Sequence, residues 1–278
     1  MGKRNRRTRE LVFYLLLAIG AAIMIYPFLI MISNAFKANV FVIEYPPKLI
    51  PDEPSISNFV RAWTSNNFQR YFVNSAVTAI TSTVGTVIVA ALAAYAFARF
   101  TFPLKEVFFW LMLIVLMIPD TISIIPKFYL ASNLQLRNNL WGLILFYIAG
   151  GISGNIFLLR GFFETLPREL EEAMTIDGAS PLRIFFKLAL PLSAPAIATV
   201  AIFSFLSNWD EYTWALTIID KPALRTLPIA IFSFQGQHGT EWGLVFAAML
   251  IALIPIFIVF FALQRYFVQG LTSGAIKG

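Results

Sequence analysis

Long apolar runs separated by short polar segments dominate the sequence of this 278-residue chain. A helix of about 20 apolar residues crosses roughly 30 Å of hydrocarbon. Six runs reach that length: residues 11–32, 71–98, 107–126, 140–159, 188–209 and 242–263. The pattern therefore predicts an all-α, polytopic membrane protein with six transmembrane helices.

The first run has a competing interpretation as a cleaved signal peptide, because it follows a basic N-terminus. Its apolar core is 22 residues long, and Phe28, Ile30 and Met31 provide no small-residue cleavage site. An uncleaved first span is therefore the preferred expectation.

The third run is interrupted by a charge, because Asp120 lies between Pro119 and Pro126. A charge at the depth of a span costs at least ~2.5 kcal/mol. Asp120 is therefore expected at the external interface, and a position facing an aqueous pathway is the alternative.

The polar segments divide the chain into three parts. Residues 1–70 hold the basic N-terminus, the first span and a proline-rich loop with a short helix expected near residues 56–63. Residues 71–264 form the core, which includes a long polar loop at residues 160–190. Residues 265–278 are a short, glycine-rich tail.

Lysine and arginine are distributed unevenly between the two sides of this six-span arrangement. Thirteen of the 21 basic residues fall on the side of the two termini and the 160–190 loop, and eight fall on the other side. Because cytoplasmic segments carry the excess of positive charge, both termini and this loop are expected in the cytoplasm. The segments at 33–70, 127–139 and 220–241 are then expected to be external.

Composition narrows the function classes. The chain is 58% hydrophobic and only 13% charged, with a mean hydropathy of +0.74, whereas about one quarter of the residues in soluble domains are charged. It has no cysteine and a single histidine, His238, so disulfides and a thiolate or histidine-built metal site are not expected. The net charge of +6 gathers beside the apolar runs, which favours membrane orientation over nucleic-acid binding.

The longest polar interruption in the second half of the chain, residues 165–195, has the pattern of two short helices joined by a glycine. Pro167 suits a first helical position, and Gly178 ends the first helix with a residue that tolerates a left-handed conformation. Ser180 and Pro181 then restart a helix as its N-cap and first residue. Such a unit at a membrane face is shaped to dock into another protein, and a solvated loop on the headgroups is the alternative.

The fifth run leads into a polar and aromatic segment, Asn208-Trp209-Asp210-Glu211-Tyr212. One interpretation is an interfacial anchor, since aromatic side chains gather at both membrane surfaces. The other is the lining of a solute pathway, because aromatic faces beside carboxylates and amides suit sugar rings. The residues alone leave both interpretations open.

Several motifs of catalysis and nucleotide binding are missing. The chain contains no G-x-x-x-x-G-K-[ST], H-E-x-x-H or G-x-S-x-G sequence, so a membrane enzyme is the weakest hypothesis. Secondary transporters need no ATP, but many use internal repeats and ionisable groups near the midplane of the bilayer. The sequence shows no convincing repeat, and the deep positions of its predicted spans hold no charge.

Three groups of residues in the 165–195 loop resemble the EAA loop of permease subunits in binding-protein-dependent ABC importers: Glu172-Ala173-Met174, Asp177-Gly178-Ala179, and Leu190-Pro191 followed by Pro195. Met174 stands where that family usually has alanine. Residues 208–216 are similar to the W-N-E-F-type segment of carbohydrate-uptake permeases of the maltose-transporter type, with Asp210 in place of the more usual asparagine. Residues 263–278 are close to the characteristic ending of those permeases.

The resemblance implies a type I ABC importer permease fold and a subunit of the cell membrane that translocates a di- or oligosaccharide or a related polyol derivative. The implied partners are a second homologous permease, two ABC ATPase subunits that bind ATP and Mg²⁺, and an external solute-binding protein. The chain itself is then expected to bind no cofactor and no nucleic acid and to be no enzyme. A permease for a non-sugar solute and a proton-coupled secondary carrier are the alternatives.

Three sets of candidate site residues follow. The coupling set, expected to dock into the ATPase, comprises Glu172, Ala173, Met174, Asp177, Gly178, Ala179 and Pro191. The pathway set, expected to contact the solute, comprises Asn208, Trp209, Asp210 and Tyr212. The outer-loop set, expected to contact the binding protein, comprises Gln235, Gly236, Gln237, His238 and Gly239.

Overall fold

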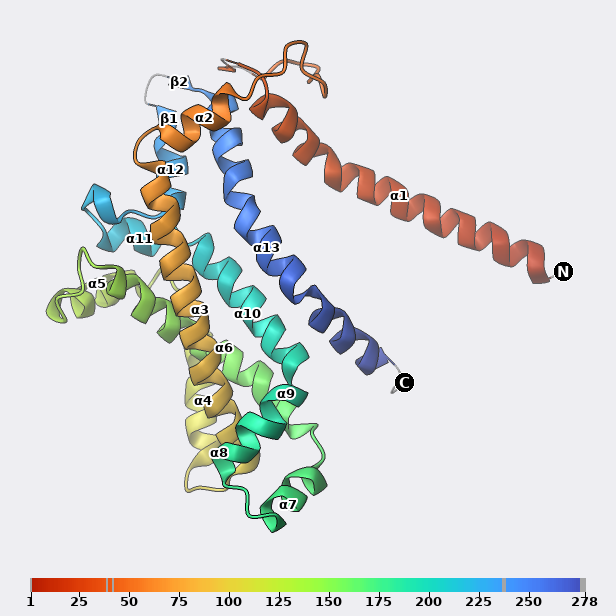
Figure 1. Ribbon diagram of the computed structural model, residues 1–278, viewed down its shortest axis with the longest axis vertical. Coiled ribbons are helices and arrows are strands. Elements are labelled where there is room, and N and C mark those ends of the chain that lie inside the picture. Colours follow the sequence, from red (N-terminus) through yellow and green to blue (C-terminus); the bar gives the residue numbers. More distant parts are fainter. Residues whose placement is uncertain (1, 39, 42, 237–238, 276–278) are drawn as a thin grey trace. The chain divides into compact units, whose positions relative to one another are not determined.

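The computed structural model describes residues 2–38, 40–41, 43–236 and 239–275 (Figure 1). The chain divides into two compact units. Unit 1 comprises residues 1–69 and 230–254, and unit 2 comprises residues 70–229 and 255–278.

Unit 1 is built from helix α1 (Gly2–Ala35), helix α2 (Ser57–Thr64), the first residues of α3 (Phe68–Arg99) and the first half of α13 (Trp242–Ala275). A short antiparallel ribbon of β1 (Gln235–Gly236) and β2 (Gly239–Thr240) leads into α13. The short helix expected near residues 56–63 is confirmed as α2. Most of the large apolar side chains of α1 from residue 11 onward are exposed, which is typical of a helix that faces lipid.

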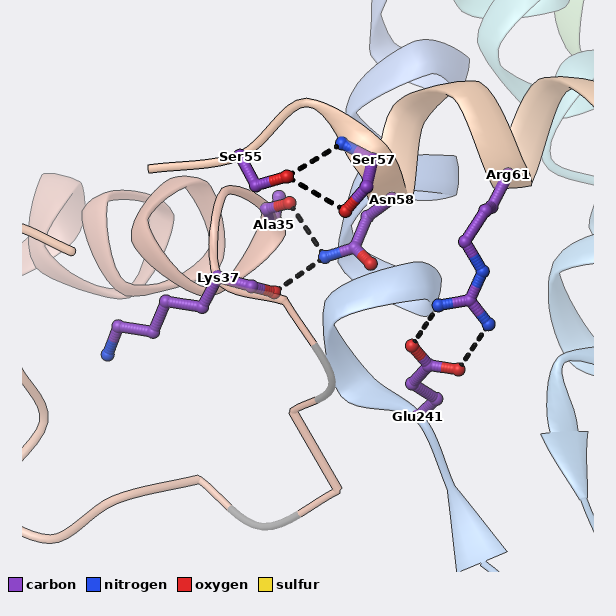
Figure 2. A network of polar contacts seen from close by, with 7 residues as sticks. All are labelled: Ala35, Lys37, Ser55, Ser57, Asn58, Arg61 and Glu241. Atoms are coloured by element: carbon purple, nitrogen blue, oxygen red, sulfur yellow. Dashed lines mark hydrogen bonds and ion pairs between the residues drawn. The ribbon is translucent and has the colours of Figure 1, made fainter. Parts of the chain in front are cut away.

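A polar network ties α2 to its neighbours in unit 1 (Figure 2). The buried Asn58 side chain donates to the backbone carbonyls of Ala35 and Lys37, at 3.0 and 2.7 Å, and so satisfies carbonyl groups at the end of α1. Arg61 and Glu241 form a two-pronged ion pair with N–O distances of 2.5 and 2.7 Å. This pair joins α2 to the residue between β2 and α13.

Unit 2 holds most of the helices. After α3 come α4 (Lys105–Val115), α5 (Ile124–Asn133), α6 (Leu140–Glu164), α7 (Arg168–Ile176), α8 (Pro181–Ile184), the π-helical turn η1 (Phe185–Ala189), α9 (Leu190–Leu192), α10 (Ala194–Trp209), α11 (Thr213–Ile218) and the 3₁₀ turn η2 (Pro222–Leu224). The boundary between the two units falls within α12 (Leu227–Ser233), after Ile229. α6 packs against both α4 and α10. α7 and α8 lie at the end of unit 2 that the last turn of α3 reaches (Figure 1).

The core of unit 2 forms where α3, α6 and α10 meet. Ala90 and Ala94 of α3 are fully buried, and their small side chains let the helices approach closely. Ile156 and Leu159 of α6 and Val200 of α10 fill the adjoining space. The alanine-rich half of α3 therefore lies inside a helix bundle.

Four helices in the described part of the chain are long and apolar enough to cross a membrane, over residues 9–35, 68–99, 140–164 and 242–266. They coincide with four of the six predicted spans. A fifth candidate is a bent pair of segments, Pro181–Leu192 and Ala194–Trp209, which meet at 79°.

Prolines explain this bend. Pro195 has no N–H group and cannot donate to the carbonyl of Pro191, so one helical hydrogen bond is missing at the junction. Just before this break, the N–H of Ser193 still donates to the carbonyls of Ala189 and Leu190, at 3.0 and 3.2 Å. The fifth predicted span is therefore bent rather than straight.

The third predicted span, residues 107–126, which Asp120 was expected to interrupt, is helical only in its first part. α4 ends at Val115 after 11 residues, which is about 16 Å of helix and roughly half of the hydrocarbon thickness. The chain then makes turns through Pro119 and Asp120 before α5 begins at Ile124. Proline removes a helical hydrogen bond and disfavours helix at the residue before it, which accounts for the break.

Close packing predicts contrasting effects for two glycines of α6. A Cβ atom at Gly142 would overlap the backbone carbonyl oxygen of Leu136, whereas a Cβ atom at Gly150 would meet nothing within 4 Å. We expect Gly142→Ala to lower the free energy of unfolding in detergent by roughly 1–3 kcal/mol. Gly150→Ala, the matched control, is expected to be neutral or to stabilise by up to about 1 kcal/mol, because alanine favours helix. Equal melting temperatures for the two variants would contradict this packing.

Candidate functional site

The α7–α8 loop (residues 165–195) folds as the predicted helix–glycine–helix. At the end of α7, the N–H of Ala179 donates to the carbonyl of Met174 at 2.9 Å, and the N–H of Gly178 donates to that of Thr175 at 3.0 Å. These two hydrogen bonds form a Schellman motif, in which Gly178 has a φ of 77°. The prediction that this glycine adopts a left-handed conformation is confirmed.

The start of the second short helix also follows the sequence pattern. The Ser180 hydroxyl accepts the N–H of Arg183 at 3.4 Å, and Pro181 is the first residue of α8. Pro167 precedes α7 as its N-cap instead of serving as its first residue, a difference of one position. The loop is therefore a defined structure with its own caps.

One acidic side chain holds α7 against the helix bundle. Glu171 Oε1 accepts a hydrogen bond from Arg99 Nε at 2.8 Å, and its Oε2 accepts one from Tyr95 Oη at 3.3 Å. Arg99 also donates to the carbonyl of Leu166 at 2.7 Å. The side chains of Arg99 and Glu171 are only 6% and 15% exposed, so the ion pair is nearly buried. It determines which face of α7 turns inward.

The opposite face of α7 projects away from the bundle. Ile176 is 87% exposed, although its side chain is large and apolar. Most of the coupling set shares this surface: Glu172, Ala173, Asp177 and Gly178 are exposed, and Met174 and Ala179 are half-buried. Pro191 lies apart from them in α9. The loop thus combines exposed acids with an exposed apolar side chain.

A cavity of about 850 Å³ lies in unit 2, lined by residues of α3, α5, α6, α10 and α11 and by the chain between α4 and α5. Hydrogen-bonding side chains face it from α6 and α10. Asn155 donates to Ser204 Oγ at 3.1 Å, and Asn208 donates to Thr83 Oγ1 of α3 at 3.4 Å. The lining therefore combines amide and hydroxyl groups with apolar side chains.

Glu211 is the best-connected side chain of this cavity. Its carboxylate accepts the Tyr147 hydroxyl at 2.8 Å and the N–H groups of Trp214 and Ala215 at 2.6 and 3.0 Å. It therefore caps the first turn of α11 while it faces the cavity. Sequence analysis did not select Glu211, although an acid placed three residues before a free N–H at a helix start is a recognisable capping signal.

Only one member of the pathway set lines the cavity. Asn208 lines the cavity, and so does Glu211. Trp209 is only 2% exposed and packs against the rings of Phe72 and Phe205, with centroid distances of 5.6 Å in each case. The other two members of the set, Asp210 and Tyr212, do not belong to the lining. Trp209 is a packing residue in this conformation.

The outer-loop set lies in unit 1. Gln235, Gly236 and Gly239 belong to the β1–β2 ribbon, whereas Gln237 and His238 lie outside the described residues. The ribbon continues into Glu241, whose ion pair with Arg61 fixes its base. The hydrogen bonds that Arg61 donates to the Glu241 carboxylate raise the pKa of Arg61 above its ordinary value. The Arg61–Glu241 ion pair thus attaches the base of the ribbon to α2.

The described residues provide no metal centre, since no three His, Cys, Asp or Glu side chains among them come together as ligands. Among the carboxylates of the α7–α8 loop and of the cavity, Glu171 and Glu211 accept hydrogen bonds from protein donors.

Comparison with known proteins places the chain in a family. Residues 86–273 match the family model described as "Binding-protein-dependent transport system inner membrane component". The chain belongs to this family and is an ABC importer permease subunit, a transport component rather than an enzyme. Membership implies a solute-binding protein and an ATPase as partners, and a location in the membrane.

Individual relatives match over nearly the whole chain. The probable ABC transporter permease protein YurM of Bacillus subtilis (strain 168) is 37% identical over 91% of this chain and 84% of YurM. The sn-glycerol-3-phosphate transport system permease protein UgpE of Salmonella typhi is 36% identical over 97% of this chain and 98% of UgpE. One chain of a bacterial ABC transporter involved in the import of the acidic polysaccharide alginate shares the fold, with a TM-score of 0.82, 24% identity and coverage of 96% and 99%.

The buried ion pair predicts how α7 can be loosened. Glu171→Ala leaves Arg99 as a nearly buried, uncompensated charge, which costs about 3 kcal/mol. We expect hydrogen–deuterium exchange of residues 168–178 to rise by roughly a hundredfold, with little change in the core of unit 2. Glu169→Ala is the matched control, because Glu169 is an exposed acid in the first turn of the same helix. Equal exchange in the two variants would show that the pair does not hold α7.

Proposed function

We propose that this permease subunit carries a sugar, meaning a di- or oligosaccharide or a related polyol derivative, and that the α7–α8 loop couples transport to ATP hydrolysis. The observation that carries the coupling role is the two-faced α7. Its inner face is fixed by Glu171, and its outer face presents Glu172, Ala173 and Ile176 in a charged and apolar surface. Such a surface on a short, capped helix fits a groove on a separate subunit.

The proposed assembly contains a second homologous permease, two ABC ATPase subunits and an external solute-binding protein. ATP and Mg²⁺ belong to the ATPase subunits, since this chain has no phosphate-binding motif. The β1–β2 ribbon, attached to α2 through Arg61 and Glu241, is the proposed contact for the binding protein.

The cavity supports a sugar or polyol as the solute. Amide and hydroxyl groups such as Asn155 and Ser204 provide hydrogen bonds, and Phe146 and Trp214 provide aromatic surface beside them. A sugar ring presents hydroxyl groups at its edge and C–H groups on its faces, so it can use both kinds of contact. A permease for a non-sugar solute is the second candidate, and a proton-coupled secondary carrier is the alternative from another class.

The proposed topology has six crossings, with α4 and the turns after it forming the third. Both termini and the α7–α8 loop are then cytoplasmic, and residues 33–70 and 220–241 are external. The loop carries four basic residues, Arg160, Arg168, Arg183 and Lys187, if its flanks from residue 160 are included.

Because the natural chain has no cysteine, single substitutions report orientation directly. Ser180→Cys and Glu53→Cys both place a thiol at an exposed position. We expect a membrane-impermeant thiol reagent added outside intact cells to label the Glu53 variant only, and to label the Ser180 variant only after the membrane is opened. Labelling of both variants in intact cells would overturn the proposed topology.

The coupling role is tested most sharply at Gly178. Its φ of 77° makes any side chain strained by about 1–2 kcal/mol, and a valine there would project from an exposed surface where two proteins meet. We expect Gly178→Val to abolish uptake and weaken association with the ATPase. Glu172→Ala should do the same to a lesser degree, because it removes a charge-assisted contact.

Membrane insertion should stay normal in both variants, because neither residue lies in an apolar span. The control is Gly161→Val, at a helical glycine where an added Cβ atom would meet nothing within 4 Å. The coupling assignment would be wrong if Gly178→Val and Glu172→Ala both showed the uptake of the unmodified chain. The same variants would also have to retain undiminished association with the ATPase in a pull-down.

A further inference from the structure

The described lining of the cavity holds more acidic than basic side chains. Its ionisable carboxylates are Asp120 and Glu211, and Lys127 is its single basic residue. Lys127 is already occupied, because it forms an ion pair with Asp120. Among the described lining residues, therefore, no cation is left to receive an anionic solute, and one carboxylate remains without a cationic partner.

Glu211 is held in place by hydrogen bonds to its carboxylate. All three of its hydrogen bonds come from donors, two backbone N–H groups and the Tyr147 hydroxyl, so both carboxylate oxygens act as acceptors. The same donors would be the natural ligands of a phosphate or carboxylate group on a solute. Because Glu211 uses them, it both adds negative charge and removes the groups that could bind an anion.

The rest of the polar lining is uncharged. It consists of hydroxyl and amide groups, among them Ser153, Asn155, Ser207 and Asn208. Hydroxyl and amide groups donate and accept hydrogen bonds, so they match the hydroxyl groups of an uncharged polyol. A cleft that carries charge of one sign between low-dielectric walls focuses the electric field. A single carboxylate without a cationic partner therefore has a large effect on which ions enter.

We propose that this cavity selects an uncharged, polyhydroxylated solute and excludes anions such as phosphate esters and uronates, with Glu211 as the specificity-determining residue. The proposal rests on the proposed function, in which the cavity forms part of the solute pathway, and narrows its substrate class. Under this proposal, the solute of this chain differs in charge from the solute named for the sn-glycerol-3-phosphate permease protein, although the two chains are 36% identical.

The test uses the absence of cysteine. Ser207→Cys places one thiol on the cavity lining, at an exposed position. In vesicles that carry the assembled transporter, the thiol is modified by two methanethiosulfonate reagents of similar size, one with a trimethylammonium group and one with a sulfonate group. The ratio of the two rates, divided by the same ratio for free 2-mercaptoethanol, reports the electrostatic potential of the cavity. We expect this normalised ratio to favour the cation by roughly tenfold.

Charge-removing variants identify the source of the potential. Glu211→Gln in the Ser207→Cys background should bring the normalised ratio close to one. Asp120→Asn should lower it as well, because it frees Lys127, and this exposed site tolerates substitution if Glu211→Gln fails to fold. The matched control, Glu53→Gln, removes an exposed acid that does not line the cavity and should leave the ratio unchanged. A ratio of one or below in the parent protein would overturn the inference.

A transport measurement separates this inference from the proposed function. ATP-driven uptake of radiolabelled sn-glycerol-3-phosphate by the same vesicles, supplied with the binding protein, is expected to stay at background. Uptake of that anion would overturn the inference while it upheld the role as an ABC importer subunit. A cation-favouring ratio that falls in Glu211→Gln would uphold the inference even if Gly178→Val showed that the α7–α8 loop has no coupling role.

Discussion

The ion pair between Arg99 and Glu171 determines how the α7–α8 loop meets the rest of unit 2. Moving two charges out of water is costly, and the cost is offset only when the remaining donors and acceptors find partners. Here the Leu166 carbonyl takes a further Arg99 N–H, and the Tyr95 hydroxyl takes the second carboxylate oxygen. The Tyr95 ring lies among the rings of the apolar core, so the polar contact and the packing of α3 fix the same geometry. One acid thus sets the orientation of a whole helix.

A second carboxylate, that of Glu211, also pairs groups that the fold would otherwise leave without partners. It lies just beyond the C-terminal end of α10. The chain leaves α10 there and starts α11 almost at once, and the first N–H groups of α11 need acceptors. Glu211 satisfies two of them and also accepts the Tyr147 hydroxyl. The Trp214 indole N–H, in turn, donates to the carbonyl of Gly142, where the glycine lets the two helices touch. The carboxylate that faces the cavity is therefore the same group that caps the start of α11.

Sequence reasoning succeeded where local chemistry decides the structure and failed where tertiary contacts do. The left-handed Gly178 and the Ser180 cap follow from their own side chains and immediate neighbours. The break after Val115 was missed because an apolar run indicates hydrophobicity and not an unbroken hydrogen-bond ladder, even though Pro119 and Pro126 were visible. Glu171 was missed for a different reason. Adjacent helical residues point about 100° apart, and only the position of the bundle tells which acid turns inward.

The bend at Ser193 connects these features. Bent helices are tolerated in hydrocarbon only where the backbone groups freed by the bend are satisfied again. The N–H of Ser193 is shared between the carbonyls of Ala189 and Leu190, and its own carbonyl accepts the N–H of Ile197 at 2.9 Å. The hydrogen bonds of Ser193 therefore continue on both sides of the 79° bend, which turns the chain from the direction of α10 into that of α8. The bend therefore lets one continuous stretch of chain place the α7–α8 loop at one end and Asn208, facing the cavity, at the other.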